Sequence, residues 1–121
     1  MKNLEQVRAA AALETARHLD KKAVNKLPAL ILNNGLLATI AFVNSDSSGA
    51  NRKDMLDAML ATGKHLHHRN LVSGVFESLD QLASDLASKS SIHLQRATTE
   101  ALAYIGYLRR FATKGNDSNE D

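Results

Sequence analysis

A run of 17 residues from Leu27 to Val43 constrains the fold more than any other part of the sequence. It is apolar except for a proline, two asparagines, a glycine and a threonine. These interruptions and its length make it unsuitable as a membrane span. From Ala29 onward its apolar residues occupy the whole circumference of a helix, so neighbouring helices must cover every side. We therefore expect a central buried helix over about residues 28–43, with Pro28 in the first turn, where a missing N–H is tolerated.

The composition of the remaining chain favours helices joined by short loops. The 121 residues include one proline, six glycines and no cysteine. Few turn residues argue against a sandwich or barrel. The absence of cysteine excludes disulfides, thiolate metal sites and cysteine catalysis. We predict an all-α fold: a compact single domain over residues 1–114, with about five helices around the central one.

The spacing of apolar residues predicts where the other helices lie. It predicts one over about residues 3–24, one from Asn51 to about residues 65–69, a narrow seam over residues 72–86 and a last helix over about residues 92–113. Arg8 falls inside the apolar stripe of the first helix. An arginine there must reach a carboxylate or meet a partner, unless its head group extends along the surface into solvent.

Charge is unevenly distributed along the chain. The formal net charge is +2, but Asp117, Glu120 and Asp121 lie within the last residues, and without them fifteen basic side chains face ten acidic ones. We expect residues 115–121 to form a flexible acidic tail. The basic balance of the remainder indicates a polyanionic partner.

Catalytic and metal-binding patterns are weak. Of His65, His67 and His68, only His65 and His68 share a helical face, and no carboxylate stands at a familiar ligand spacing. The chain offers no strand followed by a phosphate-binding loop, and its serines fall in loop-like or capping contexts. We therefore expect no enzyme activity, no cofactor, no metal and no small-molecule substrate. The polar start of the chain is unlike a secretory signal, so we expect a cytoplasmic protein without membrane contact.

Basic residues are the remaining functional signal. Lys21, Lys22 and Lys26 cluster near the end of the first expected helix, and Arg96, Arg109 and Arg110 lie on the last one. Arg96 and Arg110 flank a strip of low side-chain bulk, which a polyanion or a second helix could approach closely. Few aromatic residues are available for base stacking. We expect contacts to phosphate and sugar rather than to bases.

Three segments carry a resemblance to a known family. They are residues 3–9 (NLEQVRA), residues 25–42 (NKLPALILNNGLLATIAF) and residues 96–112 (RATTEALAYIGYLRRFA). In this order they resemble the small α-helical subunit of type III-B CRISPR effector complexes, the Cmr complexes. Residues 44–91 match that family in pattern only.

The resemblance implies a non-catalytic subunit of an RNA-guided antiviral ribonucleoprotein. Copies of such subunits stack as an inner filament beside the other Cmr subunits and line the groove that receives the target RNA and its duplex with the guide RNA. We select contact candidates for RNA or a neighbouring subunit from the matched segments and the basic cluster: Arg8, Lys21, Lys22, Lys26, Arg96, Arg109 and Arg110.

A second hypothesis stays open from the sequence. A helical adaptor or nucleic-acid-binding regulator unrelated to CRISPR would share the basic, all-α character. It would need a dimer and a recognition helix, and no helix-turn-helix spacing is visible.

Overall fold

The computed structural model describes residues 2–45, 52–74 and 76–112. Within these residues the chain forms six α-helices and no strand, which confirms the all-α prediction and raises the helix count from about five. The helices are α1 (Leu4–Ala16), α2 (Lys21–Asn34), α3 (Leu36–Ser45), α4 (Arg52–His68), α5 (Leu79–Ala87) and α6 (Ser91–Phe111). The acidic tail expected at residues 115–121 lies outside the described residues.

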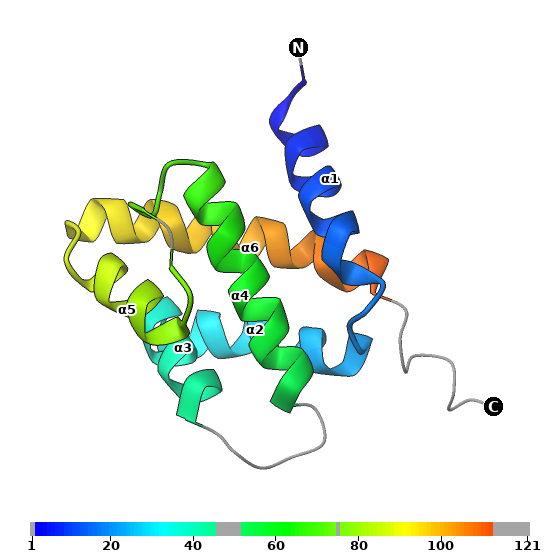
Figure 1. The fold of residues 1–121 in the computed structure, drawn as a ribbon, viewed down its shortest axis with the longest axis horizontal. Helices are drawn as coiled ribbons and strands as arrows, with labels where there is room; N and C mark the ends of the chain where they lie inside the picture. Colours follow the sequence, from blue (N-terminus) through cyan, green and yellow to red (C-terminus); the bar gives the residue numbers. More distant parts are fainter. Residues whose placement is uncertain (1, 46–51, 75, 113–121) are drawn as a thin grey trace.

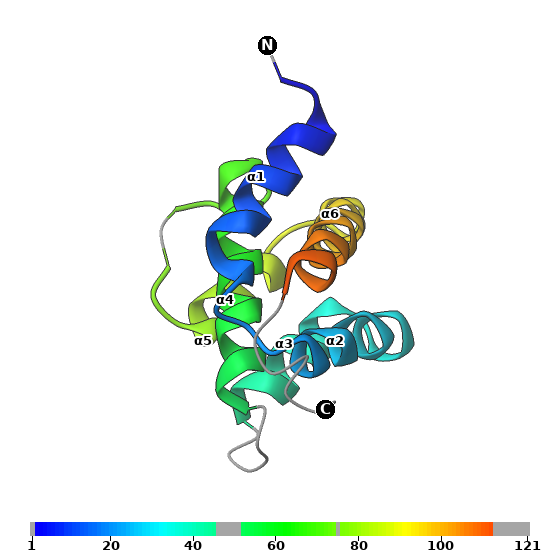
Figure 2. The same cartoon turned by 90° about the vertical axis from the view of Figure 1, so that its right-hand side faces the viewer.

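The long helix α6 organises the fold. It crosses behind α4 and behind the lower end of α1 (Figure 1), and it contacts α1, α2 and α4. Viewed from the side, α6 and α2 lie one above the other on one side of the molecule, with α1 and α4 on the other (Figure 2). The core between them contains Leu27, Met59, Leu66 and Tyr104, each at most 1% exposed.

The first helix is shorter than predicted. Instead of continuing to about residue 24, α1 ends at Ala16, and a new helix begins at Lys21. Asp20 causes the break, because its carboxylate accepts a hydrogen bond from the backbone N–H of Lys22 and caps α2. The backbone N–H of Asp20 in turn donates to the Asp54 carboxylate on α4, 2.7 Å away. The apolar spacing continues across the break because Leu19, between the helices, is also buried.

The central helix predicted over residues 28–43 is divided in two. Gly35 separates α2 from α3 with φ of 94° and ψ of 159°, a backbone conformation almost confined to glycine. Pro28 lies inside α2 rather than in its first turn. Because proline has no N–H, the carbonyl of Val24 lacks the helical hydrogen bond that residue 28 would otherwise donate. The chain nevertheless remains helical on both sides of Pro28.

Nor is this run covered on every side. Leu32 is 72% exposed and Phe42 46%, whereas Ile31 and Ile40 are buried. Two short helices on the outside of the core each bury one face, so the strongly apolar sequence leaves some large side chains in solvent.

The segment between α4 and α6 also differs from the predicted seam. Residues 69–74 are not helical, and α5 begins only at Leu79, after Ser78 caps it. Asn70 has a positive φ of 65°, which ends the preceding helical region. The ring of Phe76 packs directly on Gly63 of α4, where a Cβ atom would not fit. Val75, which belongs to the predicted seam, lies outside the described residues.

The last helix agrees best with the sequence pattern. It runs from Ser91 to Phe111, and the side chain of Ser90 caps it by accepting from the backbone N–H of His93 at 3.1 Å. Its buried face includes Ala97, Ala101 and Leu108, as the spacing predicted. It also includes an acidic residue, Glu100, which the apolar pattern did not indicate.

Candidate nucleic-acid interface

A basic pocket forms where α2 begins and α6 ends. The Asp20 cap places Lys21 in the first turn of α2, and the last turn of α6 carries Arg109 and Arg110. These side chains line, with Asn25, a pocket of about 180 Å³ that we call the basic pocket. The fold thus brings together residues that are 84 positions apart in the sequence, as the Asn25 and Arg109 contact shows.

Within the described part of the chain, a hydrogen bond orients one cation of the basic pocket, and no carboxylate pairs with any of the three. The Arg109 Nε–H donates to the Asn25 side-chain oxygen at 3.0 Å, which orients the guanidinium. Among the described residues, Lys21, Arg109 and Arg110 form no ion pair with any carboxylate. Three cations without a carboxylate partner among the described residues, one in the first turn of α2 and two in the last turn of α6, favour an anionic ligand with several charges, such as a phosphate backbone.

Arg96 lies in a second hollow towards the other end of α6. This Arg96 groove, of about 450 Å³, contains two apolar side chains beside polar ones. Its lining residues are Leu71, Ile92, Gln95, Arg96, Thr99 and Glu100. Ile92 is 62% exposed, and Arg96 has no ion-pair partner within the described chain. The groove offers an apolar rim with one cation, which suits a sugar–phosphate segment or a neighbouring protein surface.

The remaining candidates on α2 are exposed but do not line either hollow. Lys22 and Lys26 lie on the solvent side of the helix. The sequence cluster of Lys21, Lys22 and Lys26 is therefore split, with only Lys21 facing the arginines of α6.

Arg8 is placed differently from the other candidates. Its guanidinium holds the Glu100 carboxylate by two hydrogen bonds, from Nε to Oε2 at 2.9 Å and from Nη2 to Oε1 at 2.7 Å. This bidentate pair links α1 to α6, and it raises the pKa of Arg8 because the hydrogen bond favours the charged form. Of the possibilities for Arg8, the structure shows the one in which it reaches a carboxylate.

Glu100 also accepts a hydrogen bond from α4. His65 Nε2 lies 2.7 Å from Oε2 of Glu100, and the His65 side chain is only 1% exposed. Burial would raise the pKa of Glu100, but the hydrogen bonds from Arg8 and His65 outweigh it and keep the pKa below its ordinary value. Glu100 is therefore ionised at neutral pH. We call Arg8, Glu100 and His65 the buried network.

Burial also fixes the state of His65. It lowers the pKa of the imidazole, despite the opposing effect of Glu100, so the ring is neutral at pH 7. Because Glu100 can only accept, the proton lies on Nε2, and Nδ1 has no hydrogen-bond partner among the described residues. The ring stacks on Tyr104 of α6, with centroids 4.5 Å apart and planes 12° from parallel. Burial raises the pKa of Tyr104 to about 12.

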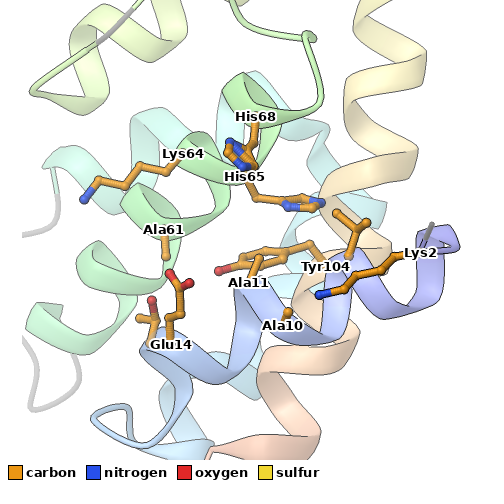
Figure 3. Close-up of a pocket in the computed structure, with 11 residues that line it drawn as sticks. Lys2, Ala10, Ala11, Glu14, Ala61, Lys64, His65, His68 and Tyr104 are labelled. Carbon is orange, nitrogen blue, oxygen red and sulfur yellow. The ribbon is translucent and has the colours of Figure 1, made fainter.

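A hollow of about 410 Å³ lies beside His65 and Tyr104. Figure 3 shows that small side chains, Ala10, Ala11 and Ala61, leave this space open between α1 and α4. Lys64 also lines the hollow, and its amino group extends away from His65 and Tyr104 in the same view.

The sequence pattern contained a signal for the buried network that single-helix reasoning missed. Glu100 lies between Ala97 and Tyr104 on the apolar face of α6, as Arg8 does on that of α1. A charged residue on a buried face needs a partner of opposite charge, so Arg8 and Glu100 could have been predicted to pair. The sequence did not indicate that His65 is buried, because with His67 and His68 it resembled a polar, exposed helix end.

The described part of the chain contains no group of three or more histidine, aspartate and glutamate side chains that could hold a metal ion. No helix among those residues is long and apolar enough to cross a membrane.

Comparison with known proteins identifies a family. The model of a family described as CRISPR-associated protein (Cas_Cmr5) matches residues 3–114. No curated protein and no solved structure matches the chain.

Proposed function

This chain belongs to the CRISPR-associated Cas_Cmr5 family, a family of Cmr subunits, and we propose that it is a non-catalytic structural subunit of that type III-B complex. In this role it stacks with further copies of itself as an inner filament and contacts other Cmr subunits. It lines the path of the target RNA and the guide RNA in antiviral defence. The family assignment rules out the hypothesis of a regulator unrelated to CRISPR.

The basic pocket is the observation that carries the RNA-binding part of this proposal. Lys21, Arg109 and Arg110 converge there from two helices, and none of them is paired with a carboxylate of the described chain. The Arg96 groove supports a longer path, since Arg96 and Arg110 stand about four turns apart on one side of α6. A subunit that serves many guide sequences must bind backbone rather than bases.

Arg8 has a structural role in this proposal. Its guanidinium is committed to Glu100, and withdrawing it would leave a buried carboxylate with only His65 as a partner. RNA contact is therefore assigned to Lys21, Arg96, Arg109 and Arg110, with Lys22 and Lys26 as supplementary positions on α2.

The test is target RNA binding by the assembled complex carrying Arg109→Ala with Arg110→Ala. We expect weaker retention of unrelated target sequences by similar factors. The dependence of log affinity on log salt should fall by roughly one unit, as for the loss of one or two phosphate contacts. Lys53→Ala with Lys64→Ala on α4 removes the same charge outside the pocket and serves as the matched control.

Gel filtration of each reconstituted mixture separates RNA contact from subunit contact. If the arginine variant fails to enter the complex, the basic pocket is a subunit interface rather than an RNA site. If the variant assembles and binds target RNA as the control does, the pocket has no part in RNA binding.

A further inference from the structure

The hollow beside His65 and Tyr104 has no part in the function proposed above. It holds about 410 Å³ and lies between α1 and α4, away from the basic pocket and the Arg96 groove. We call it the α1–α4 hollow. Sites for small molecules have volumes of roughly 300 to 1,000 Å³, so the space is large enough for a ligand of that class.

The walls of the α1–α4 hollow are apolar and carry little bulk. Val7, Ala10 and Ala11 line it from α1, and Ala61 lines it from α4 (Figure 3). Residues three and four positions apart share one face of a helix, so the α1 residues form a continuous wall. Methyl groups on two facing helices leave room for a flat ring and give it apolar contacts on both sides.

A buried atom beside this space lacks a hydrogen bond. His65 lines the hollow, its side chain is only 1% exposed, and its Nδ1 has no partner among the described residues. Because the proton of the neutral ring lies on Nε2, which donates to Glu100, Nδ1 is an acceptor. A ligand that carries an N–H or O–H group would supply the missing donor.

Opposite charges lie at the two ends of the hollow. Figure 3 shows the Lys2 amino group on one side of the Tyr104 ring and the Glu14 carboxylate on the other. Within the described chain, neither Lys2 nor Glu14 forms an ion pair. A ligand that fits both ends has an anionic group for the lysine and a hydrogen-bond donor for the carboxylate.

We propose that the α1–α4 hollow binds a small planar molecule that carries an anionic group and hydrogen-bond donors, as a nucleoside monophosphate does. The ring lies between the alanine walls, the phosphate pairs with Lys2, and N–H or O–H groups bind His65 Nδ1 and Glu14. A free nucleotide and the phosphorylated end of an RNA strand both present this chemistry.

The test is an NMR titration of the full chain with adenosine 5′-monophosphate (AMP). We expect the methyl signals of Ala10, Ala11 and Ala61 to shift, together with the ¹⁵N signal of His65 Nδ1. Adenosine, which has no phosphate, should bind roughly threefold to tenfold more weakly, the loss expected for an exposed ion pair and its hydrogen bonds. Inorganic phosphate alone should leave the alanine signals in place.

A variant that fills the hollow shows whether the ligand occupies it. Ala10 is exposed on α1, so Ala10→Leu adds bulk at the hollow without changing the core, and it should weaken AMP binding at least about tenfold. Ala41→Leu makes the same change at an exposed position of α3 and serves as the control. Equal affinity in the two variants would overturn the inference.

The phosphate contact has its own variant. Lys2→Ala should weaken AMP binding roughly threefold without affecting adenosine, whereas Lys53→Ala, outside the hollow, should change neither. An equal loss for AMP and adenosine in Lys2→Ala would contradict the phosphate contact.

Further outcomes separate this site from the RNA function. AMP-induced shifts confined to the Arg109 and Arg110 side chains would overturn the inference and leave the basic pocket standing. Shifts at the alanines in a protein whose complex does not bind target RNA through the basic pocket would support the hollow and contradict the RNA proposal. Oligouridine RNA with and without a 5′-phosphate identifies the source: shifts with the phosphorylated strand indicate an RNA end, and shifts with AMP alone indicate a free nucleotide.

Discussion

Charged residues in this protein fall into two groups that differ in their burial. Arg8 and Glu100 lie on apolar helix faces and hold each other, with His65 as a third member. Arg109 and Arg110 are exposed and form no ion pair within the described chain. The first group joins helices, and the second is available to a ligand.

Removing the charge of Glu100 tests the structural use. In Glu100→Gln, the Arg8 guanidinium loses its carboxylate partner. The single amide oxygen of glutamine cannot replace both carboxylate oxygens, which accept from Arg8 and His65. We expect the free energy of unfolding to fall by roughly 2 to 4 kcal/mol. Urea unfolding followed by circular dichroism measures it, with the exposed Glu77→Gln as a control. A loss of stability no larger than the control's would contradict the network's role.

The same residues predict a pH dependence. The pKa of His65 is lowered by burial, so the unfolded chain takes up the proton more readily than the folded one. Stability should be complete above the ordinary imidazole value of 6.5 and fall as the pH drops below it. Glu100, whose pKa is also lowered, adds a further loss below its ordinary value of 4.5.

Thermal unfolding between about pH 5 and pH 8 checks this dependence, in a window set by the ordinary histidine pKa. His65→Gln should flatten the loss of stability between about pH 7 and pH 5.5, and exposed His18→Gln should retain it. Equal profiles for the two variants would mean that His65 does not titrate as a buried group.

At the scale of elements, Gly35 decides how the apolar run folds. A Cβ atom at Gly35 would meet no heavy atom within 4 Å, so the positive φ alone requires glycine. Gly35→Ala should cost about 1 to 3 kcal/mol. Gly106, inside α6, has only the Arg110 guanidinium nearby, at 3.8 Å, and Gly106→Ala should be neutral or stabilise by up to about 1 kcal/mol.

Thermal melts of the two glycine variants provide the comparison, because the substitution is identical and only the backbone conformation differs. Destabilisation by both would point to lost flexibility rather than to backbone strain at Gly35.

The helices themselves show what a single sequence can predict. Helices α4 and α6 agree with their predicted ranges because their apolar periodicity stops where the helices stop, and Ser90 caps the start of α6. The predictions were wrong at residues 17–20 and at Gly35, where apolar spacing continues across a break. The spacing of apolar residues indicates which residues are buried rather than which are helical. Leu19, for example, is buried although it lies between two helices. Only the cap at Asp20 and the glycine marked these boundaries.

For the molecule as a whole, the sequence shows which residues are basic but does not predict which of them lie close together in the fold. Lys21 and Arg110 are far apart in the chain, and their common pocket depends on how α2 lies along α6. The partnership of Arg8 with Glu100 likewise needs the packing of α1 on α6. Contacts of this kind are set by tertiary structure, which helical periodicity does not encode.

The distribution of free cations over the molecule leads to a prediction for longer RNA. Arg96 and the basic pocket mark two points along α6, so Arg96→Ala combined with Arg110→Ala should weaken binding more than either change alone. The two losses should add, because the sites share no side chain. Target RNA titrations of the assembled complex measure this, and a double variant equal to one single variant would show that only one hollow meets RNA.

RNA contact by this subunit is tested most directly by photo-crosslinking 4-thiouridine-substituted target RNA to the assembled Cmr complex and mapping the crosslinked peptides of this subunit. We expect crosslinks in the segment that begins α2, around Lys21 and Asn25, and in α6 between Arg96 and Arg110. Crosslinks confined to other subunits, or to the face of α4 around Lys53, would contradict it.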